Sequence, residues 1–193
     1  MKTYHIKRFL LVLPVLLIAL AGCQNKTDMN NNNDMKGEAT NIQKAIAVIQ
    51  PLNNSGVHGI VYFTKVQDGI KIIADIDGLT PGKHGFHIHE YGDLRSDDGT
   101  SAGGHFNPYG KPHGAPGAKE SHVGDMGNIV ATNKVPTAHY IYTDSLMSFS
   151  GINSIIGRSV IIHQGEDDLT SQPSGNAGKR VAGGVIGIAN GNL

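Results

Sequence analysis

The chain has 193 residues, of which 39% are hydrophobic and 17% charged, and its 16 Lys and Arg residues balance its 16 Asp and Glu residues. This balance, without a Lys/Arg cluster, argues against nucleic acid as a partner, because such proteins carry a basic patch and a high pI. A single cysteine excludes an internal disulfide, so stability must come from the core and from any bound ion.

Residues 1–22 are predicted to be a secretory signal and not part of the fold. Lys2, Lys7 and Arg8 precede an apolar run at 9–21, which is too short to cross a bilayer alone, since about 20 residues are needed. The run ends in Leu20-Ala21-Gly22-Cys23, which resembles the lipidation box of bacterial lipoproteins. We therefore expect lipidated Cys23 to anchor the protein to the outer face of a cell membrane. An ordinary signal peptide followed by an incidental cysteine is the alternative.

Residues 23–43 are polar, with four consecutive asparagines at 30–33, and are predicted to form a lipidated flexible spacer. Twenty residues of flexible coil have an end-to-end distance of about 25 Å. Loss of residues 1–22 leaves 13 Lys and Arg against 16 Asp and Glu, a formal charge of −3. Residues 44–193 are then 150 residues, which is the size of one domain.

Strand patterns dominate this domain. In residues 70–77, Ile70, Ile72 and Ile76 share one face, Lys71 and Asp75 lie on the other, and an Asp-Gly pair precedes the run. Similar segments are predicted as strands at 44–52, 57–66, 70–77, 85–90, 128–135, 139–143, 159–164 and 181–189. Eight short strands joined by glycine-rich connections predict an all-β antiparallel sandwich or flattened barrel with an aliphatic core.

Two connections, residues 91–127 and 165–179, are long and rich in Gly, Pro and polar residues. Loops of this length are uncommon in a compact domain unless they are functional or disordered. Most of the candidate metal ligands lie in or beside them. We therefore expect these loops to build a site that a metal ion orders.

The candidate ligands are six histidines and one aspartate. His87 and His89 alternate with apolar residues, so both rings should project from one face of a strand, and His163 ends another apolar run. Imidazole is the commonest ligand for zinc and copper, and one carboxylate among imidazoles suits tetrahedral zinc. The full set is His87, His89, His105, His113, His122, Asp125 and His163.

The loop ligands are framed by conformationally special residues, unlike those of a histidine-rich metal buffer. Gly103-Gly104 precede His105, Pro112 precedes His113, and Gly124 precedes Asp125. Glycine permits turns closed to other residues, and proline fixes φ. This framing favours a loop that folds back repeatedly on an ion. His58, His84 and His139 lack it and are interpreted as structural or solvent-facing.

Four motifs together resemble copper/zinc superoxide dismutase over nearly all of residues 44–193. They are Gly85-Phe86-His87-Ile88-His89-Glu90, Ser101-Ala102-Gly103-Gly104-His105-Phe106-Asn107-Pro108, His122-Val123-Gly124-Asp125 and Gly175-Asn176-Ala177-Gly178-Lys179-Arg180. The resemblance implies an eight-stranded Greek-key β-sandwich. It also implies that superoxide is the substrate and is converted to dioxygen and hydrogen peroxide, with redox-active copper and structural zinc.

The resemblance further implies a role for each residue. Copper would be bound by His87, His89, His105 and His163, and zinc by His105, His113, His122 and Asp125. His105 would join the two ions and carry a proton. Asp167 would link the rings of His87 and His113, and Arg180 would attract the anionic substrate.

The chain departs from this family in its disulfide, whose positions correspond to Gly99 and Gly183. A native disulfide typically contributes about 2–4 kcal/mol, so we expect the loop at 91–127 to depend on zinc for its order. The loop at 165–179 is also short for the family. The alternative function, a non-enzymatic metal-binding or copper-handling lipoprotein on the same scaffold, would be marked by loss of a copper ligand or of Arg180, and all are present.

Overall fold

The computed structural model describes residues 42–191, which form eight strands and one short 3-10 helix, η1, at Thr100–Ala102. The strands are β1 (Lys44–Pro51), β2 (His58–Val66), β3 (Gly69–Asp77), β4 (Gly82–His89), β5 (Asp125–Ala131), β6 (Thr137–Asp144), β7 (Ser159–His163) and β8 (Arg180–Ile188). The predicted leader, and the predicted spacer except for Ile42 and Gln43, lie outside the described residues. Within residues 42–191 no helix is long and apolar enough to cross a membrane.

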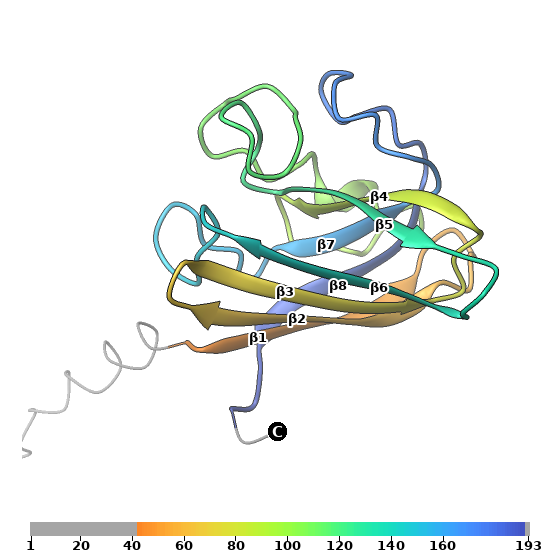
Figure 1. Ribbon diagram of the computed structural model, residues 1–193, viewed down its shortest axis with the longest axis horizontal. Coiled ribbons are helices and arrows are strands. Elements are labelled where there is room, and N and C mark those ends of the chain that lie inside the picture. The colour runs from red at the N-terminus through yellow and green to blue at the C-terminus, as the bar shows by residue number, and fades with distance from the viewer. Residues whose placement is uncertain (1–41, 192–193) are drawn as a thin grey trace, which may run out of the picture. The chain divides into compact units, whose positions relative to one another are not determined.

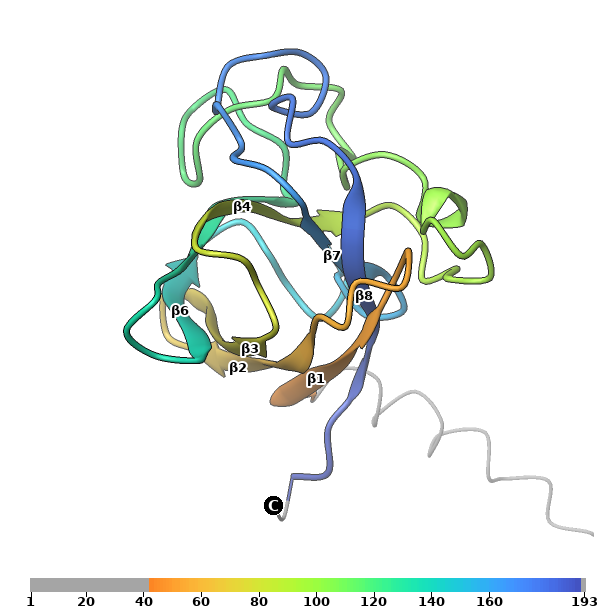
Figure 2. The ribbon, with the colours of Figure 1, turned by 90° about the vertical axis from the view of Figure 1, so that its right-hand side faces the viewer.

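The strands form one antiparallel sheet in the order β5-β4-β7-β8-β1-β2-β3-β6. Seen end-on in Figure 2, the sheet curls round so that β4 and β7 face β2 and β3. The two edges approach each other where the Tyr140 hydroxyl donates to the Met126 carbonyl, at 2.8 Å. The crossovers from β3 to β4 and from β6 to β7 give a Greek-key connectivity. The predicted all-β sandwich or flattened barrel is therefore confirmed.

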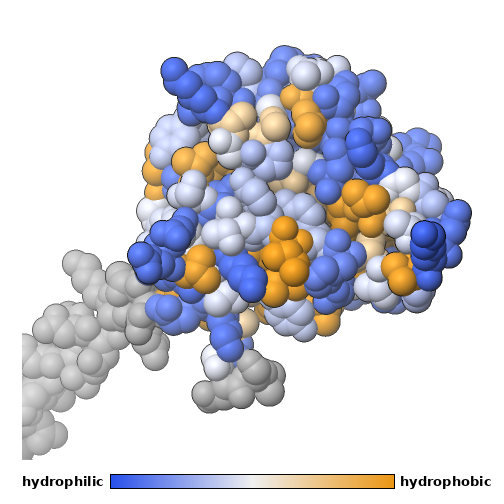
Figure 3. All heavy atoms as spheres, in the orientation of Figure 1, coloured by the Kyte–Doolittle hydropathy of each residue, from blue (hydrophilic) through white to orange (hydrophobic). Residues whose placement is uncertain are grey.

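Alternation along the strands explains how the core forms. In β3 the side chains of Ile70, Ile72 and Ile76 are at most 2% exposed, while Lys71 between them faces solvent. Each buried Ile contributes about 1.5–3 kcal/mol through removal of apolar surface from water. Ile and Ala supply most of the buried hydrophobic residues, so the core is mainly aliphatic as predicted, and Phe63 and Phe86 are its fully buried aromatic side chains. Figure 3 shows that hydrophobic residues on the visible face are separated by hydrophilic ones.

Some predicted strand limits were wrong. β4 begins at Gly82 instead of residue 85, because Gly82, Lys83 and His84 pair with Ala131, Val130 and Ile129 of β5. β5 occupies 125–131 instead of 128–135, because residues 132–135 close a turn with a bridge between Thr132 and Val135. Cross-strand hydrogen bonds decide both limits, and they override local propensity.

The two long connections follow β4 and β7, which are neighbours in the sheet. Both views show them rising on the same side of the sheet, above β4 (Figures 1 and 2). The Gly124 amide donates to the Phe106 carbonyl at 2.9 Å, and the Gly165 amide donates to the Ala177 carbonyl at 2.9 Å, so each loop folds back on itself. At Gly124 a Cβ would lie 2.2 Å from the Ile88 carbonyl oxygen, so only glycine allows this close approach to β4.

Candidate metal centre

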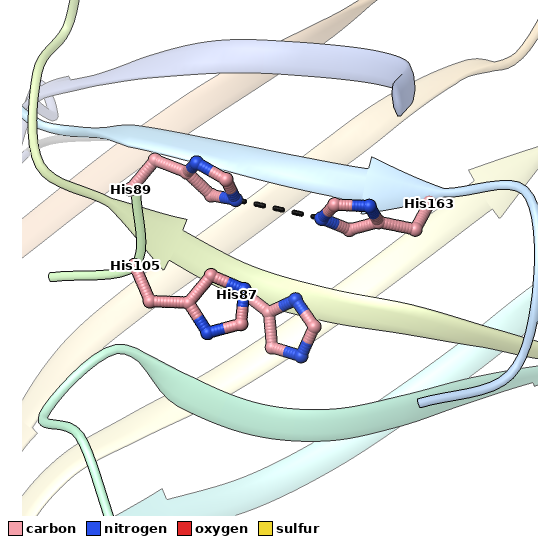
Figure 4. Close-up of side chains that lie close together, drawn as sticks. All are labelled: His87, His89, His105 and His163. Carbon is pink, nitrogen blue, oxygen red and sulfur yellow. Dashed lines mark hydrogen bonds between the residues drawn. The ribbon is translucent and has the colours of Figure 1, made fainter. Parts of the chain in front are cut away.

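Four imidazoles gather where β4, β7 and the first long loop meet. His87 and His89 project from β4, and His163 ends β7. His105 is brought to them by an isolated antiparallel bridge between its backbone and that of His89. One ring nitrogen from each of the four lies within 4.8 Å of the others, and all four residues are buried. Figure 4 shows the rings close together, with Nε2 of His89 and Nε2 of His163 3.4 Å apart.

The second nitrogen of three of these rings is already occupied. His89 Nδ1 lies 3.0 Å from the Gly103 carbonyl, and His163 Nδ1 lies 3.1 Å from the Gly178 carbonyl. His87 Nε2 lies 2.9 Å from Asp167 Oδ2. Because each acceptor requires an N–H, the opposite nitrogen of each ring keeps its lone pair for a ligand. His87 Nδ1 and His105 Nε2 are buried with no hydrogen-bond partner, which a bound cation would supply.

A second group lies around Asp125, the first residue of β5. Its Oδ1 atom faces three imidazole nitrogens, His105 Nδ1 at 2.9 Å, His113 Nδ1 at 3.0 Å and His122 Nδ1 at 3.2 Å. Its Oδ2 atom accepts from the amides of His122 and Gly114 at 2.9 and 3.1 Å. Tetrahedral zinc with bonds of about 2.05 Å would separate its ligand atoms by about 3.3 Å. Three nitrogens and one oxygen at these separations fit zinc in both chemistry and spacing.

His105 belongs to both groups, with Nε2 toward the first and Nδ1 toward the second. The two groups are joined again through Asp167 in the second long loop. Its Oδ1 accepts from His113 Nε2 and its Oδ2 from His87 Nε2, both at 2.9 Å. All sequence-predicted ligands thus lie in two adjacent clusters, and Asp167 joins these clusters through His87 and His113.

Two residues that hold this arrangement were missed by sequence reasoning. The Asn128 side chain on β5 donates to the Asp167 carbonyl at 2.9 Å and accepts from the Asp167 amide at 2.8 Å. The Gln172 side chain makes the same paired contact with the His113 backbone, at 2.9 and 2.8 Å. Both are ordinary polar residues in sequence, and no motif marked them. Gly175 is equally necessary, because a Cβ there would lie 1.8 Å from Asp167 Oδ1.

The two groups differ in electrostatics. Burial lowers the pKa of His105 to about 4 and that of His163 to about 3, so these imidazoles are neutral near pH 7. Burial also opposes protonation of His113, but hydrogen bonds to Asp125 and Asp167 prevail and raise its pKa to about 9. Hydrogen bonds from His105, His113 and His122 hold the pKa of Asp125 below its usual range despite burial. Hydrogen bonds from His113 and His87 do the same for the pKa of Asp167.

Arg180 opens β8 beside the first group. Its guanidinium donates to the Gly99 carbonyl and, at 2.7 Å, to the Gly103 carbonyl. It lines a cavity of about 650 Å³ together with His89, His105 and His163. A fixed positive charge beside a redox-active ion would draw in a small anion.

The three histidines excluded from the site have other surroundings. The ring nitrogens of buried His84 lie 2.9 Å from the His163 carbonyl and 2.8 Å from the Thr80 carbonyl. His139 Nδ1 lies 2.6 Å from Asp75 on the exposed surface, and His58 is also exposed. Their structural or solvent-facing interpretation is confirmed.

An all-β barrel with a buried pair of imidazole-rich clusters sharing one ring defines a two-metal protein. The family model described as copper/zinc superoxide dismutase matches residues 57–186. A relative named extracellular superoxide dismutase [Cu-Zn] from Brugia pahangi is 42% identical over 175 residues, covering 85% of this chain and 86% of the relative. The superoxide dismutase [Cu-Zn] of Paramecium bursaria Chlorella virus 1 is 45% identical over 160 residues, covering 79% and 84%.

A third relative, the extracellular superoxide dismutase [Cu-Zn] of Onchocerca volvulus, is 42% identical over 171 residues, covering 83% of this chain and 82% of its own. The chain belongs to the copper/zinc superoxide dismutase family. Members of this family are oxidoreductases that use copper and zinc, and the clusters described above fit both ions.

Proposed function

We propose that this chain converts superoxide to dioxygen and hydrogen peroxide with copper held by His87, His89, His105 and His163, and with zinc held by His105, His113, His122 and Asp125. The observation that carries this proposal is the shared ring of His105, with one nitrogen in each cluster. When bound, copper supplies one-electron redox chemistry that alternately takes and returns an electron, while zinc, which has no redox chemistry, supplies fixed charge and structure.

The side chains around the cavity would divide the remaining work. Arg180 binds and orients the anion, because its guanidinium is fixed by two carbonyls and faces the same cavity as the copper-side rings. The peroxide product takes up two protons. His105 Nε2, which is buried and has no hydrogen-bond partner, would hold one of them when it does not bind copper. Asp167 keeps His87 and His113 oriented by accepting a hydrogen bond from each.

The decisive experiment combines metal analysis with superoxide decay on the full chain. We expect one copper and one zinc per chain, and decay of superoxide far above the metal-free protein in stopped-flow measurements. Copper and zinc bound at these ratios without catalysed decay would overturn the enzymatic proposal. That result would favour the non-enzymatic copper-handling alternative. The presence of Arg180 and of all four copper-side imidazoles argues against this alternative.

We also propose export and membrane attachment. Two of the relatives bear the name extracellular superoxide dismutase, and residues 1–22 have the composition of a secretory leader that ends before Cys23. The protein would then be a bacterial lipoprotein with residues 23–43 as its spacer and residues 44–193 as its enzymatic domain. It would lie on the outer face of a cell membrane.

Mass spectrometry of the N-terminal peptide from cells that express the full chain tests this attachment. We expect a peptide that begins at Cys23 and carries lipid, and partition of the protein into the membrane fraction. Cys23→Ser should lose the lipid and release the protein while its metal content stays unchanged. An unmodified Cys23 in the membrane-bound wild-type protein would contradict the proposal.

A further inference from the structure

We infer that Leu52 and Asn53, in the connection between β1 and β2, are positioning residues for Arg180. Neither belongs to the metal clusters, and neither carries charge. They nevertheless hold both the backbone of Arg180 and the loop whose carbonyls fix its guanidinium. The inference rests on the proposed role of Arg180 in binding the substrate anion.

Leu52 fills the space between the first long loop and β8. A Cβ at Gly99 would lie 2.7 Å from Leu52 Cδ1, and a Cβ at Gly183 would lie 3.3 Å from the same methyl carbon. That methyl group therefore occupies room that two glycines leave open, one on each side. Leu52 is 7% exposed and packs with buried Ile161 and Ala102 and half-buried Leu94. This apolar cluster fastens the loop to the sheet where the resemblance implied a disulfide.

The loop held in this way provides the acceptors for Arg180. The guanidinium donates to the carbonyls of Gly99 and Gly103. The Gly103 carbonyl oxygen also lies 3.0 Å from His89 Nδ1. The Gly103 carbonyl thus links the guanidinium to a copper-side ring. Movement of residues 99–103 away from β8 would displace the guanidinium relative to that ring.

Asn53 connects the backbone of Arg180 to the first long loop by hydrogen bonds. Its side-chain amide donates to the Arg180 carbonyl at 2.9 Å, and its backbone amide donates to the Asp97 carbonyl at 2.9 Å. The neighbouring Leu52 amide donates to the Val181 carbonyl at 2.8 Å. Two consecutive residues therefore bridge β8 and the loop by packing and by hydrogen bonds. Displacement by about 1 Å can cost orders of magnitude in rate, so such fixing matters for orientation of the anion.

Leu52→Ala tests the apolar part, with Leu146→Ala as the matched control at a leucine that is 38% exposed. In the metal-loaded full chain we expect kcat/KM for superoxide to fall about tenfold in Leu52→Ala and its dependence on ionic strength to flatten, with copper and zinc content unchanged. Leu52→Met conserves volume and should restore both properties. Leu146→Ala should match the wild type.

A second readout needs no metal. In the metal-free protein we expect phenylglyoxal to modify Arg180 several times faster in Leu52→Ala than in wild type or Leu146→Ala, as followed by peptide mass spectrometry. Asn53→Gly removes the side-chain amide but keeps a residue that tolerates the φ of 52° found there, and it should also speed modification. It serves as the test if Leu52→Ala does not fold.

The outcomes separate this inference from the proposed function. A metal-loaded wild type without superoxide activity would overturn the function. If the wild type is active, and Leu52→Ala and Asn53→Gly have the same salt dependence of kcat/KM and the same Arg180 reactivity as the wild type, the positioning role alone is overturned. Loss of activity in parallel with loss of copper would also overturn it, because the residues would then be acting on the metal ligands.

Discussion

The two metal clusters share a ring but are built in different ways. Three of the four imidazoles proposed to bind copper lie on strands β4 and β7, and backbone carbonyls or Asp167 fix their tautomers. The proposed zinc ligands His113 and His122 come from a long loop and contact the carboxylate of Asp125, the first residue of β5. The sheet therefore preorganises the copper side, whereas the zinc side depends on a loop that its own ligands hold together.

The largest expected effect comes from removal of His163, which lies on β7 and belongs to the proposed copper cluster alone. His163→Gln should reduce copper binding and bring superoxide decay to near the metal-free background, because one of four imidazoles is lost. Zinc content should stay at one per chain, since His163 is not one of the four residues of the Asp125 cluster. Elemental analysis with stopped-flow decay measures both, and equal loss of the two metals would show that the sides are not separable.

The two clusters differ in the pKa values of their histidines, so zinc affinity and copper affinity should depend differently on pH. The pKa of His113 is raised to about 9 in the metal-free protein, so below pH 9 zinc must displace a proton. Apparent zinc affinity should then fall about tenfold for each unit of pH decrease, or about 100-fold from pH 8 to pH 6. The copper-side pKa values of His105 and His163, about 4 and 3, predict no such loss in this window. Competition titrations with a chromophoric chelator would measure both slopes, and parallel slopes would contradict the assignment.

Arg180→Ile should have an intermediate effect on superoxide decay, and both clusters should keep their metal ions. We expect kcat/KM for superoxide to fall about tenfold and to lose most of its dependence on ionic strength, because a fixed positive charge beside the cavity is gone. Arg180→Lys keeps the charge but loses the paired contact with Gly99 and Gly103, so it should retain more of the salt dependence. Stopped-flow decay at several salt concentrations separates the variants. Identical salt slopes in wild type and Arg180→Ile would rule out steering.

The smallest expected effect concerns the loop itself. Removal of zinc should raise the rate of proteolytic cleavage within residues 91–124 several-fold, because the proposed zinc ion would join His113 and His122 to Asp125 while no disulfide joins Gly99 to Gly183. Cleavage within the strands β1 to β3 serves as the internal control and should change less. Limited proteolysis with and without chelator, mapped by mass spectrometry, gives both rates. Equal protection of the loop in both states would show that packing around Leu52 suffices.

Much of the fold was predictable because strands repeat every two residues. Alternation in residues 70–77 predicted β3 within one residue, and the β7 and β8 segments were predicted as closely. The predicted limits were wrong by two residues or more at Gly82–His84, at both ends of β5 and at the start of β6. Pairing with the distant strand β5 decides where β4 begins, whereas a local turn between Thr132 and Val135 decides where β5 ends.

The sequence by itself determined which side chains are the candidate metal ligands and which strands carry them, because imidazoles in apolar alternation and loops framed by Gly and Pro are local patterns. Only the tertiary structure decided the parts played by Asn128, Gln172, Leu52 and Asn53, which have ordinary residue types and act on segments far along the chain. Asn128 and Asp167 are 39 positions apart, and Asn53 and Arg180 are 127 apart. Such contacts arise from sheet closure and loop return, so no local pattern records them.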